Sequence, residues 1–499
     1  MYLFFFLLFG FGSINARPNF VIIMLDDLDI LLNGTAAMPT YQREMVEKGT
    51  SFRGFVDVPV CCPSRTSTLS GRYSHNLNNT NLGWCGNFRE RHEGKTWINL
   101  LKESGYETFL GGKYYNTYSD FCDANVHVPS DWTNVTLMCN DNLYFGNKFN
   151  IDGKMVKKNE SFYLTNVIGN ASISWIDNAA KRGVPFFAYI APHAPHVPAT
   201  PAHEYENTEI YSNTAPRTIN YDIAPIDHHW LVAEKTLNLT EELITFSDQL
   251  FARRLRSTMS VDDILLDLFN TLETNKILNN TYILLTSDHG YSLGQFRLPS
   301  GKFNAYENNI RVPFTIVGPG IPSNVENLDI LVNNVDIAPT ILELANISIS
   351  DYIHDGKSFV SQLLVTTTNK SSISQTSSWR DRLVFEYWGL GYTLRGPCNN
   401  GTTACPNGPE ALEDAPSNTW SGLRILNSTH NLKFAEYRTD NKAPISPTST
   451  NFTIGFDLNI DPFELENRVI GKNAWASDFI DRLRSELWDV ANCIADSCP

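Results

Sequence analysis

The chain has 499 residues, of which 42% are hydrophobic and 12% aromatic, enough apolar material for one large domain and a smaller second one. Its formal net charge of −15 and pI of about 5.2 argue against a nucleic-acid partner, because phosphate backbones are bound by basic surfaces. A small anionic substrate is still allowed, since a few cations in a cleft can reverse the local field.

The first 16 residues form a short apolar run that ends in small and polar residues. We interpret residues 1–16 as a secretory signal peptide cleaved near the bond between Ala16 and Arg17, because the run is too short to span a bilayer comfortably. No Lys or Arg precedes the run, and a buried strand is the alternative. We expect no membrane span elsewhere. Recurring Asn-X-Ser/Thr sites suit a secreted glycoprotein. These sites include Asn33, Asn78, Asn134, Asn159, Asn170, Asn238, Asn279, Asn346 and Asn451.

Three continuous apolar runs, at 19–25, 185–191 and 282–286, predict parallel strands buried on both faces. Each run leads directly into polar residues that can bind a metal or move a proton: Asp26, Asp27, His193, His196, Asp288 and His289. Amphipathic stretches between the runs, such as 96–103 and 260–273, predict crossover helices. The pattern predicts a doubly wound α/β domain that gathers these polar residues at the carboxyl edge of its sheet, where such sheets bind ligands.

Asp26, Asp27, Asp288 and His289 would supply three carboxylates and an imidazole, a set that favours a hard cation such as Ca²⁺ or Mg²⁺. An Asp-Asp pair after a strand is often only a helix cap. The Asp-His pair after another apolar strand favours a shared metal site instead.

Residues 61–71 read Cys-Cys-Pro-Ser-Arg-Thr-Ser-Thr-Leu-Ser-Gly. If a helix begins at this stretch, Cys61 and Arg65 lie on the same side of one turn, beside the partial positive charge of the helix N-terminus. Lys113 and Lys302 each follow a glycine; a lone lysine is usually on the surface, but this context favours a buried pocket. His193 and His196 could be structural, although their position at a strand end favours catalysis. Fixed cations of this kind suit the oxygens of an anionic ester.

The composition changes near residue 370. Residues 366–378 are rich in Ser, Thr and Asn and predict a linker or surface loop. Short runs at 382–387, 422–426 and 432–437 predict strands, and 474–493 predicts a terminal helix. We therefore divide the chain into the signal peptide (1–16), a catalytic domain (17–370) and a smaller antiparallel α+β subdomain (371–499).

The run at 61–71 resembles the signature of the sulfatases: Cys, any residue, Pro-Ser-Arg, and Gly six residues after the Arg. Other family-like motifs follow in order along nearly the whole mature chain, at 105–108, 112–113, 192–193, 287–290 and 457–462. Within the family the sequence is most similar to the N-acetylglucosamine-6-sulfatases, in runs 112–118, 229–231, 278–283 and 290–296. The resemblance implies an alkaline-phosphatase-like fold with a mixed sheet.

The resemblance also implies roles. Cys61 would be oxidised during synthesis to formylglycine by the formylglycine-generating enzyme, and the hydrated aldehyde would attack the sulfate ester; loss of the proton from its second hydroxyl would then expel sulfate. Arg65 would stabilise the hydrate. Ca²⁺, with Mg²⁺ as the alternative, would be bound by Asp26, Asp27, Asp288, His289 and the modified Cys61. Lys113, His193 and Lys302 would hold the sulfate and protonate the leaving oxygen. The further candidates for substrate binding are His196, His229 and Asn116.

Three positions depart from the commoner family pattern. Many relatives have Asn where His289 stands, and many arylsulfatases have His where this chain has Tyr115, which leaves His193 as the expected proton donor. Ser70 replaces a commoner Thr. The extracellular endosulfatases carry a long basic insertion that is not found here, which favours a compact exo-acting enzyme.

If Cys61 is modified, eight cysteines remain. Candidate pairs are Cys62 with Cys85, Cys122 with Cys139, Cys398 with Cys405, and Cys493 with Cys498, although connectivity does not follow from sequence. A bond between Cys61 and Cys62 is disfavoured by disulfide geometry.

The sequence therefore predicts a lysosomal or extracellular sulfatase that acts on a sulfated glycan or a small sulfate ester, with 6-O-sulfated N-acetylglucosamine of glycosaminoglycans such as heparan sulfate as the leading substrate. An arylsulfatase or another carbohydrate sulfatase is the alternative. A phosphatase or phosphodiesterase of the same fold is disfavoured because only one metal-ligand set is found. A non-catalytic glycan-binding relative would have lost some of the site residues.

Overall fold

The computed structural model describes residues 17–79, 85–116, 118, 122, 126–140, 143–233, 238–363, 379–389, 414–439 and 449–499. The larger of its two sheets has 11 strands in the order β11-β2-β10-β8-β1-β7-β3-β4-β5-β6, with β9 paired to β2. These strands are β1 (Asn19–Leu25), β2 (Thr50–Phe55), β3 (Glu107–Gly112), β4 (Asn134–Met138), β5 (Lys148–Ile151), β6 (Lys154–Lys157), β7 (Phe186–Ala191), β8 (Thr281–Ser287), β9 (Arg311–Val312), β10 (Phe314–Val317) and β11 (Val325–Asn333).

The centre of this sheet is parallel. Strand β1 pairs in parallel with β7 on one side and β8 on the other, and β7 pairs in parallel with β3. The carboxyl ends of these four strands therefore meet at one edge. Strand β10 runs antiparallel to β8, so the sheet is mixed, as the family resemblance implied.

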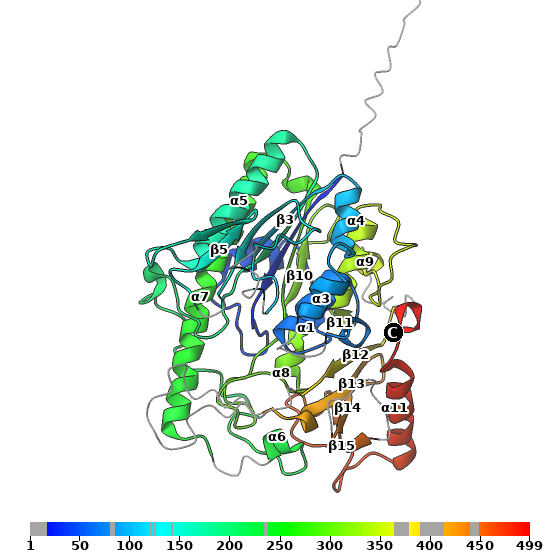
Figure 1. The fold of residues 1–499 in the computed structure, drawn as a ribbon. Coiled ribbons are helices and arrows are strands. Elements are labelled where there is room, and N and C mark those ends of the chain that lie inside the picture. The colour runs from blue at the N-terminus through cyan, green and yellow to red at the C-terminus, as the bar shows by residue number, and fades with distance from the viewer. Residues whose placement is uncertain are drawn as a thin grey trace, which may run out of the picture.

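Helices cover both faces of the large sheet (Figure 1). One face is covered by α5 (Leu164–Arg182) and α7 (Glu241–Thr274), and the other by α1 (Cys61–Ser70), α4 (Trp97–Glu103) and α9 (Ile337–Leu344). Alternate residues of β1 enter two separate cores: Val21 and Ile23 join the core beneath α5 and α7, whereas Phe20 and Ile22 join the core beneath α4 and α9. This alternation explains why β1 reads as one continuous apolar run.

Apart from the terminal helix given below, the remaining described helices are short. They are η1 (Tyr41–Val46, a π-helix), α2 (Ser74–Leu77), α3 (Gly86–Arg91), α6 (Trp230–Ala233), α8 (Glu307–Ile310) and α10 (Val360–Leu363), with 3₁₀ turns at His203–Tyr205, Leu278–Asn280, Asn334–Asp336, Pro416–Asn418 and Ala495–Ser497. Within the described part of the chain, no helix combines the length and apolar character needed to cross a membrane.

The helix predicted at 260–273 is the second half of α7, which has 34 residues. Its first half was missed because charged residues interrupt the apolar pattern there. One of these, Arg254, is nevertheless buried.

The smaller sheet is antiparallel, in the order β12-β13-β14-β15, and all three predicted strands belong to it. Its strands are β12 (Arg382–Tyr387), β13 (Thr419–Leu426), β14 (Asn431–Arg438) and β15 (Thr450–Asp457). The terminal helix α11 (Ser477–Val490) packs Leu483 and Leu487 against this sheet. The signal peptide, the linker at 366–378 and the boundary between 370 and 371 lie outside the described residues, so these three stay predictions.

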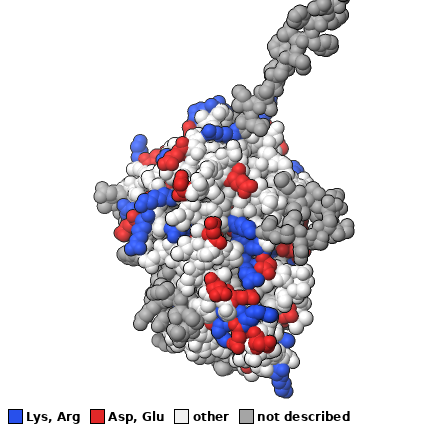
Figure 2. All heavy atoms as spheres, turned by 90° about the vertical axis from the view of Figure 1, so that its right-hand side faces the viewer, with Lys and Arg blue, Asp and Glu red and all other residues white. Residues whose placement is uncertain are grey.

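Acidic and basic side chains are intermixed on the face of the molecule that carries α11 (Figure 2). Neighbouring charges of opposite sign cancel over short distances, so this face presents no extended field of one sign in the described residues.

Three predicted disulfides are present: Cys62–Cys85, Cys122–Cys139 and Cys493–Cys498. Cys398 and Cys405 lie outside the described residues. Among the described cysteines, Cys61 is free and buried.

The two sheets are joined through a buried network of four charged residues. Glu307 of α8 lies 3.1 Å from Arg424 of β13 and 3.1 Å from Lys433 of β14. Lys433 also lies 2.6 Å from Glu464. Buried charges are stable only when paired, so this network fixes the small sheet against the segment between β8 and β9 of the large sheet.

A second connection runs through His75 of α2. Its Nδ1 lies 2.8 Å from Glu386 of β12, and its Nε2 donates to the carbonyl of Cys493 at 2.9 Å. Burial lowers the pKa of His75, but Glu386 and the Cys493 carbonyl outweigh burial and raise that pKa from 6.5 to about 9. The protonated ring therefore ties α2 to the smaller sheet and to the C-terminal disulfide.

This connection predicts a loss of stability at alkaline pH. Because the folded pKa of His75 is above the unfolded value, its contribution is complete below pH 6.5 and is lost as the pH rises through about 9. A shift of this size corresponds to about 3 kcal/mol. Urea unfolding between pH 6 and 9.5 should show the decline, and His75→Gln should flatten it; an unchanged slope in the variant would contradict the assignment.

Candidate active site

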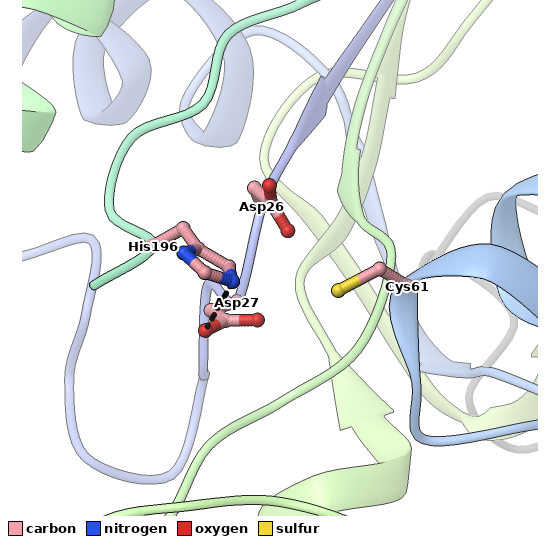
Figure 3. A group of neighbouring side chains, drawn as sticks. All are labelled: Asp26, Asp27, Cys61 and His196. Carbon is pink, nitrogen blue, oxygen red and sulfur yellow. Dashed lines mark ion pairs between the residues drawn. The ribbon is translucent and has the colours of Figure 1, made fainter. Parts of the chain in front are cut away.

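The sheet brings the predicted strand-end residues into one buried cluster with the start of α1. The cluster comprises Asp26, Asp27, Cys61, Arg65, Lys113, His193, His196, Asp288, His289 and Lys302. Asp26 and Asp27 follow β1, the two histidines of the 193–196 loop follow β7, and Asp288 with His289 follows β8. Figure 3 shows Asp26, Asp27 and His196 facing the sulfur of Cys61.

Cys61 is the first residue of α1, which follows extended backbone at Val60 and ends at Gly71 in a left-handed conformation (φ 64°). Cys61 is 1% exposed. Its sulfur lies 3.1 Å from Lys302 Nζ and 3.3 Å from His289 Nε2. The helix N-terminus adds a partial positive charge at the same point, so an anionic group there would be stabilised from two directions.

Arg65 lies one turn further along α1 and is fully buried. Its Nε donates to Asp288 Oδ2 at 2.9 Å, and its Nη1 donates to the Lys113 carbonyl at 3.2 Å. Asp288 Oδ1 in turn accepts the backbone N–H of Asp27 at 3.0 Å. Arg65 and Asp288 together therefore fix the ends of β1, β3 and β8 relative to α1.

Two buried lysines neutralise the two aspartates after β1. Lys113 Nζ lies 2.6 Å from Asp26 Oδ2, and Lys302 Nζ lies 2.7 Å from Asp27 Oδ1. Burial alone would raise the pKa of Asp26, but Lys113, His196 and Arg65 hold it well below its usual range. Burial likewise opposes ionisation of Asp27, and Lys302 is the main cation that lowers the Asp27 pKa. Both carboxylates are therefore ionised at any physiological pH.

The three histidines of the cluster each have one ring nitrogen already engaged. His193 Nδ1 donates to Asp26 Oδ2 at 2.9 Å, and its buried Nε2 has no partner among the described residues. His196 Nδ1 donates to the Val197 carbonyl, and His289 Nδ1 donates to the Gly290 carbonyl. Because a carbonyl only accepts, Nδ1 of each ring carries the proton, and in the neutral ring the lone pair is on Nε2, which is the atom a metal ion would use.

The donor atoms fit a divalent metal ion. Ligand atoms of Asp26, Cys61, Asp288 and His289 lie within 4.8 Å of one another, as do those of Asp26, Asp27, Cys61 and His196. Asp26 Oδ1 and Asp27 Oδ2 are buried without a hydrogen-bond partner among the described residues. Buried carboxylate oxygens normally have a partner, so these two atoms are the observation that favours a bound cation.

Two predicted residues are not part of this cluster. His229 stacks on Tyr437 of the smaller sheet with ring centroids 3.8 Å apart, and burial lowers its pKa to about 3. Asn116 has a buried Oδ1 without a partner among the described residues. No hydrogen bond, ion pair or ring contact joins either described side chain to the cluster, so their roles in substrate binding stay predictions.

The sequence did not reveal two residues outside α1, Asp57 and Asn334, that form hydrogen bonds to it. Asp57 accepts from Ser67 at 2.6 Å, and Asn334 donates to Asp57, Ser64 and Thr68. Asp57 follows β2, a strand that was not predicted from the sequence, so no local signal pointed to it. Nothing in the local sequence marks Asn334, which acts through contacts 270 residues away in the chain.

Gly112 places Lys113 and cannot carry a side chain. Its φ is 101°, and a Cβ there would lie 2.0 Å from the Ala191 carbonyl oxygen, the atom that accepts the Lys113 N–H at 2.8 Å. We predict that Gly112→Ala lowers the free energy of unfolding by at least about 2 kcal/mol. Gly183→Ala is the matched control, since Gly183 has φ 68° with nothing within 4 Å and should cost only about 1 kcal/mol. Equal losses in urea unfolding would contradict the steric argument.

A family model for the sulfatases matches residues 18–347. N-acetylglucosamine-6-sulfatases from Homo sapiens and Capra hircus are each 33% identical over 98% of this chain, which spans 87% and 86% of those proteins. The putative extracellular sulfatase Sulf-1 homolog of Caenorhabditis elegans is 35% identical over 75% of this chain and 53% of its own length.

Solved structures agree at the level of the fold. BT4656, solved in complex with its substrate D-glucosamine-2-N,6-O-disulfate, has a TM-score of 0.69 at 21% identity, covering 95% of this chain and 97% of its own. The phosphonate monoester hydrolase of Silicibacter pomeroyi has a TM-score of 0.68 at 20% identity, with 95% and 94% covered. The family model covers more than half of the chain, and the 33% identity to the mammalian enzymes extends over 98% of it. The chain therefore belongs to the sulfatase family.

Proposed function

We propose that this sulfatase removes the 6-O-sulfate from N-acetylglucosamine residues of glycosaminoglycans such as heparan sulfate. The observation that carries the proposal is the 33% identity to mammalian N-acetylglucosamine-6-sulfatases over 98% of the chain. A glucosamine carrying a 6-O-sulfate is also the substrate bound by the structural neighbour BT4656. The buried cluster at Cys61 supplies the groups that hydrolysis of a sulfate ester needs.

The cations of the cluster suit the binding of a sulfate group. Lys113 and Lys302 would hold its nonbridging oxygens, and Arg65 would stabilise the nucleophile. Formylglycine formed from Cys61 would supply a hydrated aldehyde as that nucleophile. Ca²⁺ is the proposed metal, with Mg²⁺ as the alternative; it would be held by Asp26, Asp27, Asp288, His289 and the modified Cys61 and would neutralise charge on the sulfate.

His193 is the proposed proton donor to the leaving oxygen. Asp26 accepts a hydrogen bond from Nδ1 of His193, which fixes the orientation of the ring. Nε2 is then free to face the ester. Burial lowers the pKa of His193, which makes its protonated form a stronger acid. Tyr115, at the position where many arylsulfatases have histidine, instead donates to Glu93 at 3.4 Å. That contact supports His193 as the donor in this chain.

The burial of Cys61 supports modification before folding. At 1% exposed, its sulfur is out of reach of another enzyme in the folded protein. The formylglycine-generating enzyme would therefore act on the unfolded chain during synthesis.

We also propose that the protein is a glycoprotein of the secretory route, either lysosomal or extracellular. Its three described disulfides suit an oxidising compartment. Eight of the nine named acceptor asparagines are exposed. The ninth, Asn134, bonds to Asp152 and Trp175 and is only partly exposed, so it is the least suited to carry a glycan.

The modification of Cys61 can be tested directly. Peptide mass spectrometry over residues 54–72 should show Cys61 lighter by replacement of sulfur with oxygen and loss of two hydrogens. Cys61→Ala should reduce hydrolysis of an aryl sulfate at least about a thousandfold with an unchanged melting temperature. An unmodified thiol in active protein, or activity retained by the variant, would refute the nucleophile.

The substrate can be tested with defined oligosaccharides. We expect kcat/KM for a non-reducing terminal N-acetylglucosamine 6-sulfate to exceed that for galactose 6-sulfate and for an aryl sulfate at least about tenfold. Sulfate release can be measured by ion chromatography, with Cys61→Ala as the blank. A preference for either of the other esters would overturn the substrate while leaving the family assignment intact.

A further inference from the structure

Arg254 lies in the middle of α7, on the far side of the cluster from α1, and is 3% exposed. Its Nη2 donates to the carbonyl of Asp27 and to Asp29 Oδ2, both at 2.7 Å. Its Nη1 donates to the Pro195 carbonyl at 3.4 Å. Its guanidinium lies over the ring of Tyr291 at 4.5 Å.

These contacts join the three loops that carry the strand-end residues of the site. Asp27 belongs to the loop after β1, Pro195 lies between the two histidines of the loop after β7, and Tyr291 lies two residues beyond His289 in the loop after β8. A guanidinium has five donors in a fixed plane, so one side chain can hold several carbonyls in a set geometry.

The contact with Asp27 matters most, because the backbone of Asp27 is in an unfavourable conformation. Its φ is 67°, in the left-handed region that a residue other than glycine adopts at a cost of about 1–2 kcal/mol. Its N–H is held by Asp288 Oδ1 at 3.0 Å, and its carbonyl by Arg254. With both sides of the residue held, the carboxylate is directed toward Lys302 and His289, at 2.7 and 3.2 Å.

Stability of α7 alone does not account for a buried arginine at this position. Its helix neighbours Leu250, Phe251 and Leu255 form an apolar cluster with Tyr291. A buried ion pair such as Arg254–Asp29 can often be replaced by apolar residues at no loss of stability. What an apolar side chain could not supply is the set of donors to the Asp27 and Pro195 carbonyls.

We propose that Arg254 is a positioning residue: it holds Asp27 and the 193–196 loop at the distance from Cys61 that binding of the metal and of the ester requires. The inference rests on the metal site of the proposed function, and it concerns a residue that acts through others rather than on the substrate.

The test compares Arg254→Met with Arg253→Met. Arg253 is the adjacent residue of α7, only partly buried, and no hydrogen bond or ion pair joins it to the described residues, so it is a matched control. Calcium binding to metal-free full-length protein is measured by titration calorimetry, and hydrolysis of an aryl sulfate is measured in parallel. We expect Arg254→Met to raise the Ca²⁺ dissociation constant about 10–100-fold and to lower kcat by a similar factor. Arg253→Met should change neither quantity by more than about twofold.

Equal Ca²⁺ affinity and kcat in the two variants would overturn the proposal. If Arg254→Met does not fold, Arg254→Lys and Arg253→Lys replace the pair. Lysine keeps the positive charge but lacks the planar set of guanidinium donors. The same loss of Ca²⁺ affinity and of kcat is therefore expected only at position 254. If the wild-type protein binds no Ca²⁺, the metal site is refuted, and kcat of the lysine pair then decides on Arg254: a loss at 254 alone supports positioning, and equal rates overturn it.

Discussion

The pairing of three buried carboxylates with three buried cations is the constraint on which the site depends. Each carboxylate has its own partner: Asp26 with Lys113, Asp27 with Lys302, and Asp288 with Arg65. Unit charges about 4 Å apart attract by about 4 kcal/mol at an effective dielectric constant of 20, and these pairs are closer than that. Removal of one partner therefore leaves a charge that the interior cannot support. The set is neutral as it stands. A divalent metal would therefore leave an excess of positive charge, which an anionic ester complements even in a protein of net charge −15.

Much of this arrangement could be predicted because it follows from the topology. Parallel strands bring their carboxyl ends to one edge, so the polar residues after 19–25, 185–191 and 282–286 had to meet. The position of Cys61 beside Arg65 followed from the helical turn that the 61–71 motif predicts. In these cases the neighbours in space are related either by one turn of a helix or by the parallel pairing of adjacent strands, both of which can be inferred from sequence.

The missed residues act through long-range contacts that leave no local pattern. Arg254 lies in a stretch of α7 with several charges, which reads as a solvated helix face until the three loops are placed around it. Asn334 holds α1 from a turn that follows β11; the capping box of Asn333 and Asp336 marks that turn but not its contact with α1. The ring of His229 stacks on Tyr437 of the smaller sheet, a contact that the sequence did not indicate, and its role in substrate binding stays a prediction. A polar residue type indicates that a partner exists, but the tertiary fold decides which one.

The smaller sheet bears on the chemistry through the segment that carries Lys302. The next residue, Phe303, is held in a left-handed conformation (φ 79°). Its carbonyl accepts from Asn418 at 3.0 Å, and its ring stacks on Tyr387 of β12 with centroids 5.6 Å apart. Further along the same segment, the Glu307 N–H donates to Glu464. The C-terminal region thus holds the segment that follows Lys302 at two points, Phe303 and Glu307. The ammonium of Lys302 is held 3.1 Å from the Cys61 sulfur by its pair with Asp27, and the small sheet holds the backbone that follows it. The small sheet thereby supports the position of a lysine that we propose to bind the sulfate.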